Sequence, residues 1–208
     1  MIEYLRDPTA IYKRSFEIIR GEADLSKQPK NAQTIAVRVI HACGIPEIVD
    51  DLIITQDFAP ATLKSLAQGK PIFVDAEMVH HGIIARQLPA NVEIICTLND
   101  PRAKEIGLKS QITRSAAAVE LWLEHLEGAI VVIGNAPTAL FRLLELIDQG
   151  AAKPACIVAM PVGFVGAAES KTELIANPRG IPFAAIKGRK GGSAMASAVI
   201  NALTGDQR

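Results

Sequence analysis

The sequence predicts a three-layer α/β fold with a mainly parallel β-sheet, and two observations lead to this class. Short continuous apolar runs such as AIVVI and ACIVAM recur along the chain, and such runs are typical of parallel strands buried on both faces. Helical patterns separate these runs, and this alternation produces right-handed crossovers with helices on both sides of one sheet. We see neither a hinge-like linker nor a repeat, so we expect residues 1–208 to form a single domain.

Two helices are expected before the first strand. Asp7 and Pro8 favour a helix start, because Asp is a good N-cap and Pro fits the first helical position. We expect this helix to extend to about Arg20. After a polar linker, a second helix is expected over residues 30–43, and Gly44 is a typical helix stop.

Strands and helices then alternate to the end of the chain. The expected strands are 52–55, 71–74, 92–98, 129–133, 155–160 and 183–186. The expected helices are 61–68, 78–84, 101–127 with a break near Gly107, 137–149, 167–175 and 193–203. Ligands of such sheets bind beyond the carboxyl ends of the strands, so a site is expected in the loops that lead from strands into helices.

Composition excludes several classes of function. Lys and Arg number 22, as do Asp and Glu, and a nucleic-acid binder usually carries a basic excess. No apolar run approaches the roughly 20 residues needed to cross a bilayer. The first residues do not form a secretory signal, so we expect a cytoplasmic protein. The cysteines, Cys43, Cys96 and Cys156, form no C-x-x-C pair and suggest neither a zinc site nor a disulfide framework.

A polar stripe on the second helix is the first candidate site. Thr34, Arg38 and His41 share one face of an otherwise apolar helix. The stripe is either a solvent face or helix contact, or it faces a ligand. Ser15 on the first helix allows two similar interpretations, because its hydroxyl can bond back to a helix carbonyl or contact a ligand.

Three glycine-rich turns follow apolar runs and open helices. They are VVIGNAPTALF, MPVGFVGAAESK and IKGRKGGSAMASAV. Glycine serves tight α/β turns in any case, but three such loops on one edge, one of them basic, favour an anionic ligand. None matches a P-loop or a dinucleotide fingerprint, so neither a methyl donor nor a nicotinamide site is supported, and we expect no bound cofactor.

Two further features remain open or weak. Asp75, Glu77 and the pair His80-His81 suggest a metal, but adjacent helical residues point about 100° apart and are not expected to share one ion. We therefore expect no metal site. Arg114 lies near an expected helix start and is either a surface arginine or a ligand contact.

The segments discussed above, in their order along the chain, resemble the precorrin-8X methylmutase family, which includes cobalt-precorrin-8 methylmutases. The resemblance covers nearly the whole chain. It rests on YLRDPTAIYKRSF, RVIHACGIPE, IFVDAEMVHHGI, LNDPRA, TRSAAAVELW, IGNAPTALFRLLE, MPVGFVGAAESK and GRKGGSAMASAVINAL.

The resemblance implies a flavodoxin-like fold, a homodimer, no cofactor and a tetrapyrrole substrate. It implies an isomerase that moves a methyl group between neighbouring ring carbons of precorrin-8X to give hydrogenobyrinic acid. The alternative is the cobalt-precorrin-8 to cobyrinic acid reaction. By matching motifs, the resemblance implies that His41 is the proton donor and that Ser15, Arg38 and Arg114 contact the substrate. The first two helices, within residues 7–43, therefore carry most of the expected site.

Two rival classes make different demands on the sequence. A non-catalytic flavodoxin-like module, such as a receiver, needs acidic residues after its first strand, whereas Asp50 and Asp51 precede the strand at 52–55. A methyltransferase of the same pathway needs a donor-binding glycine loop and a larger chain. Neither demand is met.

Overall fold

The computed structural model describes residues 2–205, and its elements alternate as expected. The helices are α1 (Pro8–Glu22), α2 (Gln33–Cys43), α3 (Ile48–Asp51), α4 (Phe58–Ala67), α5 (Glu77–Gly82), α6 (Pro101–Ser110), α7 (Arg114–Glu120), α8 (Pro137–Asp148), α9 (Ala167–Ala176) and α10 (Ser193–Thr204). The strands are β1 (Leu52–Ile54), β2 (Ile72–Val74), β3 (Ile94–Cys96), β4 (Ile130–Ile133), β5 (Cys156–Ala159) and β6 (Phe183–Ile186). Short 3₁₀ turns are η1 (Leu25–Lys27), η2 (Lys30–Ala32), η3 (Ala85–Gln87) and η4 (Leu123–His125).

One six-stranded sheet organises the molecule. Its strand order is β1-β6-β5-β4-β2-β3. β1 pairs antiparallel with β6, and all other neighbours are parallel. Counted from β2, the five parallel strands follow the order 2-1-3-4-5 of flavodoxin-like folds. The predicted α/β class is therefore confirmed, and β1 is an antiparallel addition at one edge.

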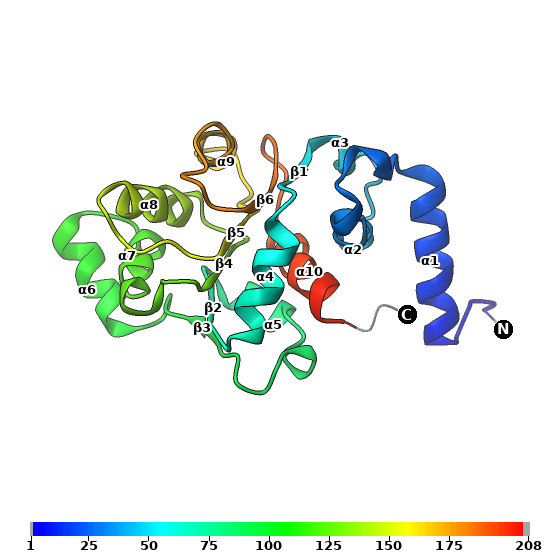
Figure 1. The fold of residues 1–208 in the computed structure, drawn as a ribbon, viewed down its shortest axis with the longest axis horizontal. Helices are drawn as coiled ribbons and strands as arrows, with labels where there is room; N and C mark the ends of the chain where they lie inside the picture. Colours follow the sequence, from blue (N-terminus) through cyan, green and yellow to red (C-terminus); the bar gives the residue numbers. More distant parts are fainter. Residues whose placement is uncertain (1, 206–208) are drawn as a thin grey trace.

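Helices cover both faces of the sheet and bury two apolar cores (Figure 1). α2, α4, α5 and α10 pack on one face, with α1 outside α2. α7, α8 and α9 pack on the other face, with α6 against α7. The all-buried strands β4 and β5 lie between the two layers, which explains their uninterrupted apolar sequences.

The expected signals operate at the start of the first helix and at the end of the second. The Asp7 carboxylate accepts a hydrogen bond from the Ala10 amide at 2.6 Å and caps α1. Gly44 ends α2 with φ of 68°, a left-handed conformation that glycine adopts without strain. A 3₁₀ turn, η2, precedes α2, so the second predicted helix is regular only from Gln33. Within residues 2–205 we find no helix long and apolar enough to cross a membrane.

The predicted break near Gly107 was placed too early. Gly107 lies inside α6, and the chain turns at Gln111, whose φ is 54°. Thr113 then caps α7 by accepting a hydrogen bond from the Ala116 amide at 3.2 Å. A Cβ at position 107 would lie 3.2 Å from the Ile112 carbonyl oxygen, a tight contact that glycine avoids. The glycine therefore permits a close helix–turn contact and does not end the helix.

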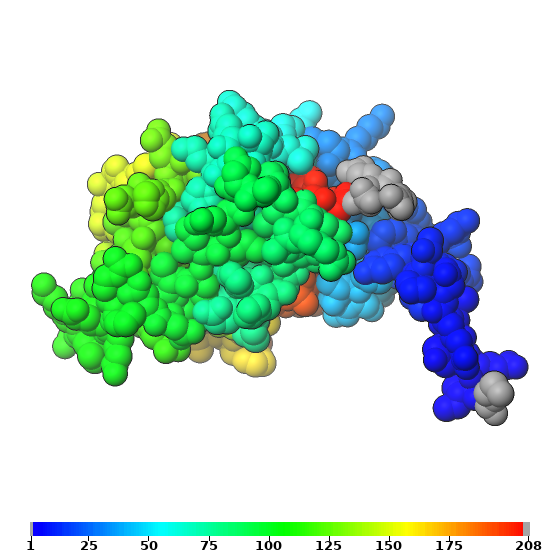
Figure 2. Space-filling model, turned by 90° about the horizontal axis from the view of Figure 1, so that it is seen from below, coloured from blue at the N-terminus to red at the C-terminus, as the bar shows by residue number. Residues whose placement is uncertain are grey.

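The first helix extends away from the body of the molecule. Figures 1 and 2 show α1, in blue, at one end of the chain's volume. Only Ile19 of α1 is buried. Several large apolar side chains of this region are exposed, namely Ile2, Tyr4, Leu5, Ile11, Tyr12 and Ile18. We call these six residues the α1 apolar surface.

Candidate active site

His41 of α2 is held in place by a hydroxyl group of α1. Its Nδ1 lies 2.8 Å from Ser15 Oγ, across the contact between α2 and α1. Of the two interpretations of Ser15, the bond back to its own helix is therefore not the one that the structure shows. The bond fixes one ring nitrogen and leaves Nε2 as the other site for a proton. This pairing suits a histidine that gives or takes a proton at Nε2.

Aromatic rings and a guanidinium complete the surroundings of His41. The Tyr12 ring stacks on the imidazole with centroids 5.4 Å apart, and the Phe16 ring meets it edge-on at 5.5 Å. The Arg38 guanidinium carbon lies 5.6 Å from the Tyr12 centroid and 5.4 Å from that of Phe16. Tyr12, Ser15 and Phe16 recur at helical spacing, a signal that the sequence contained but that we did not use for the two aromatic residues.

The electrostatic environment favours a neutral His41 in the free protein. Partial burial lowers the pKa of His41 from its ordinary value, and the positive charge of Arg38 lowers it further. The carbonyls at the α2 C-terminus act in the opposite direction, because they favour a cation. An anionic ligand bound near Arg38 would offset the repulsion and favour the imidazolium.

Two hollows meet at His41. One, of about 510 Å³, lies between α2, α5 and α10. Its lining residues are Tyr12, Arg38, His41, Ala42, Met78, Gly82, Ile84, Ser193, Ala194, Ser197, Ala198 and Asn201. The second, of about 410 Å³, lies between α1 and the end of α2 and is mostly apolar. Both are open to solvent, so together they form a broad site for a large ligand.

The N-terminus of α10 opens into the larger hollow. Ser193 and Ala194, its first two residues, line that hollow, and no side chain caps their amides. Amides at a helix N-terminus attract anions. Binding of an anion by the basic loop before α10 stays a prediction, and the helix start is better placed for it than the cations of the loop, which do not line the hollow. Lys187 and Arg189 are exposed, and Lys190 forms an ion pair with Asp51 at 3.1 Å.

The glycines of this loop serve packing as well. A side chain at Gly191 would collide with the Met160 carbonyl oxygen, and that same oxygen accepts a hydrogen bond from the Gly192 amide at 2.8 Å. Lys171 of α9 donates to the Lys190 carbonyl at 2.6 Å, and burial lowers the pKa of Lys171 to about 8. The segment MPVGFVGAAESK, which ends at Lys171, thus contacts and orders the third predicted loop.

The first predicted anion loop is already occupied by the protein itself. Asp75, which follows β2 and is 2% exposed, accepts hydrogen bonds from the amides of Gly134, Asn135 and Ala136 at 2.9, 2.9 and 2.6 Å. These amides follow β4, so Asp75 closes the crevice where the strand order reverses. The expectation that this loop receives an external anion is therefore wrong. Asp75 had been considered only as a metal ligand.

Arg114 does not join His41 within one chain. It begins α7, which packs with α6 and α8 over the other face of the sheet. The neighbouring Thr113 hydroxyl lies 2.8 Å from the Thr138 hydroxyl at the start of α8, which places Arg114 near the carboxyl edge. Arg114 is exposed and lines neither hollow at His41.

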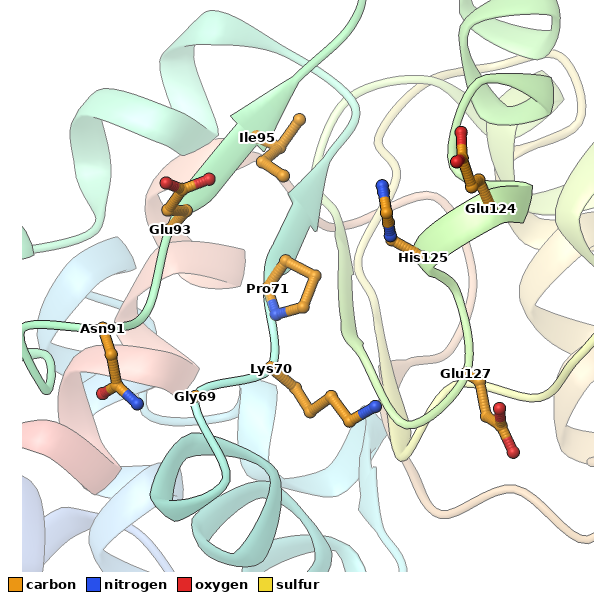
Figure 3. A pocket seen from close by; sticks show the side chains of 9 residues that line it. All are labelled: Gly69, Lys70, Pro71, Asn91, Glu93, Ile95, Glu124, His125 and Glu127. Carbon is orange, nitrogen blue, oxygen red and sulfur yellow. The ribbon is translucent and has the colours of Figure 1, made fainter.

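A further hollow of about 370 Å³ lies at the opposite end of the strands (Figure 3). Its lining residues precede β2, β3 and β4, apart from Ile95 of β3, and include Lys70, Glu93, Glu124, His125 and Glu127. Ligands of parallel sheets bind at the carboxyl ends of strands. The position and the mixed charges of this hollow therefore argue against it as the active site.

The angular argument against a shared ion at His80 and His81 does not hold in the structure. The two rings lie 5.0 Å apart at their centroids. A ligand atom of each histidine and one of Glu77 all fall within 4.8 Å of one another. The argument considered the directions of the Cα–Cβ bonds only, and rotation of the longer side chains at the end of α5 brings the rings together.

A hydroxyl-bound histidine, an arginine and a free helix N-terminus, on a flavodoxin-like scaffold, are typical of an acid–base enzyme with a large anionic ligand.

Comparisons with known proteins then identify the family. Residues 10–205 match the family model described as Precorrin-8X methylmutase. Precorrin-8X methylmutases of a Sinorhizobium species and of Pseudomonas aeruginosa are each 53% identical, covering 97% and 98% of this chain and 96% and 98% of theirs. A cobalt-precorrin-8 methylmutase of Priestia megaterium is 34% identical over 95% of this chain and 87% of its own. A crystal structure of a precorrin-8X methylmutase from Thermus thermophilus is 36% identical with a TM-score of 0.83, covering 94% of each chain. The chain therefore belongs to the precorrin-8X methylmutase family, isomerases of cobalamin biosynthesis.

Proposed function

We propose that this chain converts precorrin-8X into hydrogenobyrinic acid by an intramolecular methyl shift, with His41 as the proton donor. The observation that carries the proposal is the 2.8 Å contact between Ser15 Oγ and His41 Nδ1 at the junction of two open hollows. The imidazole is held from one side and is free to act from the other. Family membership supplies the substrate class, because the relatives are named for it.

The reaction needs an electron sink and no external group. When His41 is protonated, Nδ1–H donates to Ser15 and Nε2–H can transfer its proton to a nitrogen or conjugated position of the macrocycle. The protonated ring withdraws electrons, and the methyl group moves to the neighbouring carbon with its bonding pair. The proton then returns to His41. Atoms and electrons balance within one molecule, so we propose that the reaction uses no cofactor.

Substrate binding is assigned to cations and amides around the larger hollow. Precorrin-8X carries acetate and propionate carboxylates, for which Arg38 and the N-terminus of α10 are suitable partners. Tyr12 presents an aromatic face beside His41 against which a flat conjugated ring can pack. Ser15 acts through His41 and is therefore a positioning residue as well as a candidate substrate contact.

A homodimer would complete this site. The α1 apolar surface has no covering within the described chain, and exposed apolar patches of this kind mark interaction sites. Arg114, which lies at the carboxyl edge away from His41, would then contact the substrate held by a partner chain. Light scattering should show a dimer, and Ile2→Glu with Tyr4→Glu, which line neither hollow at His41, should yield monomer with lower activity. A fully active wild-type monomer would contradict this assembly.

The identity of the relatives favours the metal-free substrate. The named precorrin-8X methylmutases are 53% identical, against 34% for the cobalt-precorrin-8 methylmutase. Metal-free and cobalt-bearing substrates, assayed side by side for turnover, test the choice directly. A higher kcat/KM with the cobalt-bearing substrate would favour the conversion of cobalt-precorrin-8 into cobyrinic acid. All three cysteines are free thiols, as is typical of a reducing compartment, which supports a cytoplasmic reaction.

The same assay separates catalysis from binding alone. A non-catalytic binding module would retain pigment without changing it, whereas a methylmutase converts bound precorrin-8X and shifts its absorption spectrum. Protein isolated from a corrin-producing host should retain a yellow to orange pigment. Absence of turnover with both substrates, together with tight pigment binding, would contradict the enzymatic proposal.

A further inference from the structure

Three potential metal ligands gather on α5, outside the set of residues assigned to the methyl shift. One ligand atom from each of Glu77, His80 and His81 lies within 4.8 Å of the other two. Glu77 and His80 are half-buried, and His81 is exposed. Among residues 2–205, this is the one group of three or more His, Cys, Asp or Glu side chains with such spacing.

One atom of this group lacks a partner in the protein. Nδ1 of His80 is shielded from solvent and makes no hydrogen bond within the described chain. A buried polar atom without a partner costs about 1–3 kcal/mol, so native structures usually provide one. A cation bound to His80 Nδ1 would give this atom its partner and would order the ring. The other ring nitrogen, Nε2, would then carry the proton and donate to water or to a neighbour.

A hydrogen bond from a neighbouring loop orients the Glu77 carboxylate. Asn99, in the loop between β3 and α6, donates a hydrogen bond to Glu77 Oε1 at 3.2 Å. The Cys96 thiol lies beside the same carboxylate. Outer contacts of this kind are what hold metal-binding carboxylates in place.

We propose that Glu77, His80 and His81 form a binding site for one divalent transition-metal cation, such as Zn²⁺ or Co²⁺. Two imidazoles and one carboxylate are a ligand set that such borderline cations prefer over Mg²⁺ or Ca²⁺. Because Glu77 supplies one negative charge, the complex carries a single positive charge. Water can fill the remaining coordination position from the exposed side at His81.

The spacing requires small side-chain movements only. Ligand atoms about 2.0–2.2 Å from a tetrahedral Zn²⁺ lie about 3.4 Å from one another. The observed separations reach 4.8 Å at most. Rotation of the exposed His81 and of Glu77 closes a gap of this size without moving the backbone.

The site lies next to the larger hollow without belonging to it. Met78 and Gly82, on another side of α5, line that hollow, and α5 packs against α10 (Figure 1). α5 has only six residues, and its first turn has no side-chain cap. A cation that joins its first and last turns would therefore hold one wall of the hollow in place.

Metal binding to the full chain, treated with a chelator and dialysed, tests the proposal. Titration with CoCl₂ alone should produce visible d–d absorption that saturates at one ion per chain, and ZnCl₂ should displace it. His81→Ala is the preferred variant, because His81 is exposed and its removal does not disturb packing. It should weaken Co²⁺ binding by at least about 10-fold, since even outer-contact variants of metal sites lose about 10- to 100-fold.

A matched control comes from the fourth histidine. His125 is exposed between Glu124 and Glu127, in surroundings at least as acidic, and His125→Ala should bind Co²⁺ as the wild type does. Glu77→Gln keeps a hydrogen-bonding side chain but removes the charge, and should also weaken binding. The proposal is overturned if Co²⁺ uptake does not saturate, or if His81→Ala binds as tightly as wild type, or if His125→Ala abolishes binding.

Discussion

Removal of the Ser15 hydroxyl, in Ser15→Ala, is expected to slow the methyl shift about 10- to 160-fold. The reasoning starts from the 2.8 Å contact between Ser15 Oγ and His41 Nδ1. A hydrogen bond to a charged group contributes about 1.5–3 kcal/mol, and each 1.36 kcal/mol is a factor of ten. The bond involves a charged group only when His41 is protonated. Its loss therefore lowers the population of the imidazolium and leaves the ring less well oriented.

His41→Ala removes the proposed acid and should slow the reaction about 10²- to 10⁴-fold, the usual contribution of general acid catalysis. The double variant then distinguishes two roles for Ser15. If Ser15 works through His41, adding Ser15→Ala to His41→Ala should have almost no further effect on rate. If Ser15 only contacts substrate, its effect should persist unchanged in the double variant, with a matching loss of product affinity.

Single-turnover experiments provide the measurement. Enzyme in excess over substrate, at fixed pH, reports the chemical step through the change in the absorption of the tetrapyrrole. Ser110→Ala is a suitable control, since Ser110 is exposed at the end of α6 and far from α2 in the fold. Additive effects of the two active-site variants, or a near wild-type rate for His41→Ala, would refute the proposed role of the pair.

Three other predictions concern neighbouring groups. Arg38→Ala should weaken product binding by about 1.5–3 kcal/mol, the range for a charge-assisted hydrogen bond; an unchanged affinity in a titration of the folded variant would remove Arg38 from the binding site. Because burial and Arg38 lower the pKa of His41, kcat/KM should fall as pH rises through a value below 6.5, while kcat, measured with the carboxylates bound, should fall at higher pH; pH profiles in the reverse order would contradict this. Asp75→Ala should lower the free energy of unfolding by at least about 2 kcal/mol, since three amides lose their acceptor and each unsatisfied buried donor costs about 1–3 kcal/mol; an unchanged urea midpoint would show that water replaces the carboxylate.

Local signals in the sequence predicted most of the fold. Asp7 and Pro8 start the first helix and Gly44 ends the second, as expected, and the apolar runs at 130–133 and 156–159 are the central strands. The antiparallel placement of β1 was not predicted, because a three-residue strand has no feature that reveals its direction. Gly107 misled the assignment for a physical reason, since a glycine can serve a close contact as well as a helix end.

The site was less accessible to sequence reasoning because it depends on contacts between distant segments. Ser15 and His41 are 26 positions apart, and their hydrogen bond exists only because α1 crosses α2. The capture of three amides by Asp75 joins residues about 60 positions apart. Spacing along a helix indicated which residues share a face, but it did not indicate which side chain from elsewhere would fill a loop.

The position of Asp75 has a consequence for the use of topology in assigning ligands. In flavodoxin-like proteins the crevice at the reversal of strand order receives a flavin or another group from outside. In this chain the Asp75 carboxylate fills that crevice and accepts three backbone hydrogen bonds. A nucleotide could bind there only by displacing the carboxylate and breaking these three bonds. The binding surface that we propose lies instead between helices on one face of the sheet, where two adjoining hollows leave room for a broad, flat molecule. Two proteins with the same strand order can therefore differ in the shape of ligand they admit through one acidic residue.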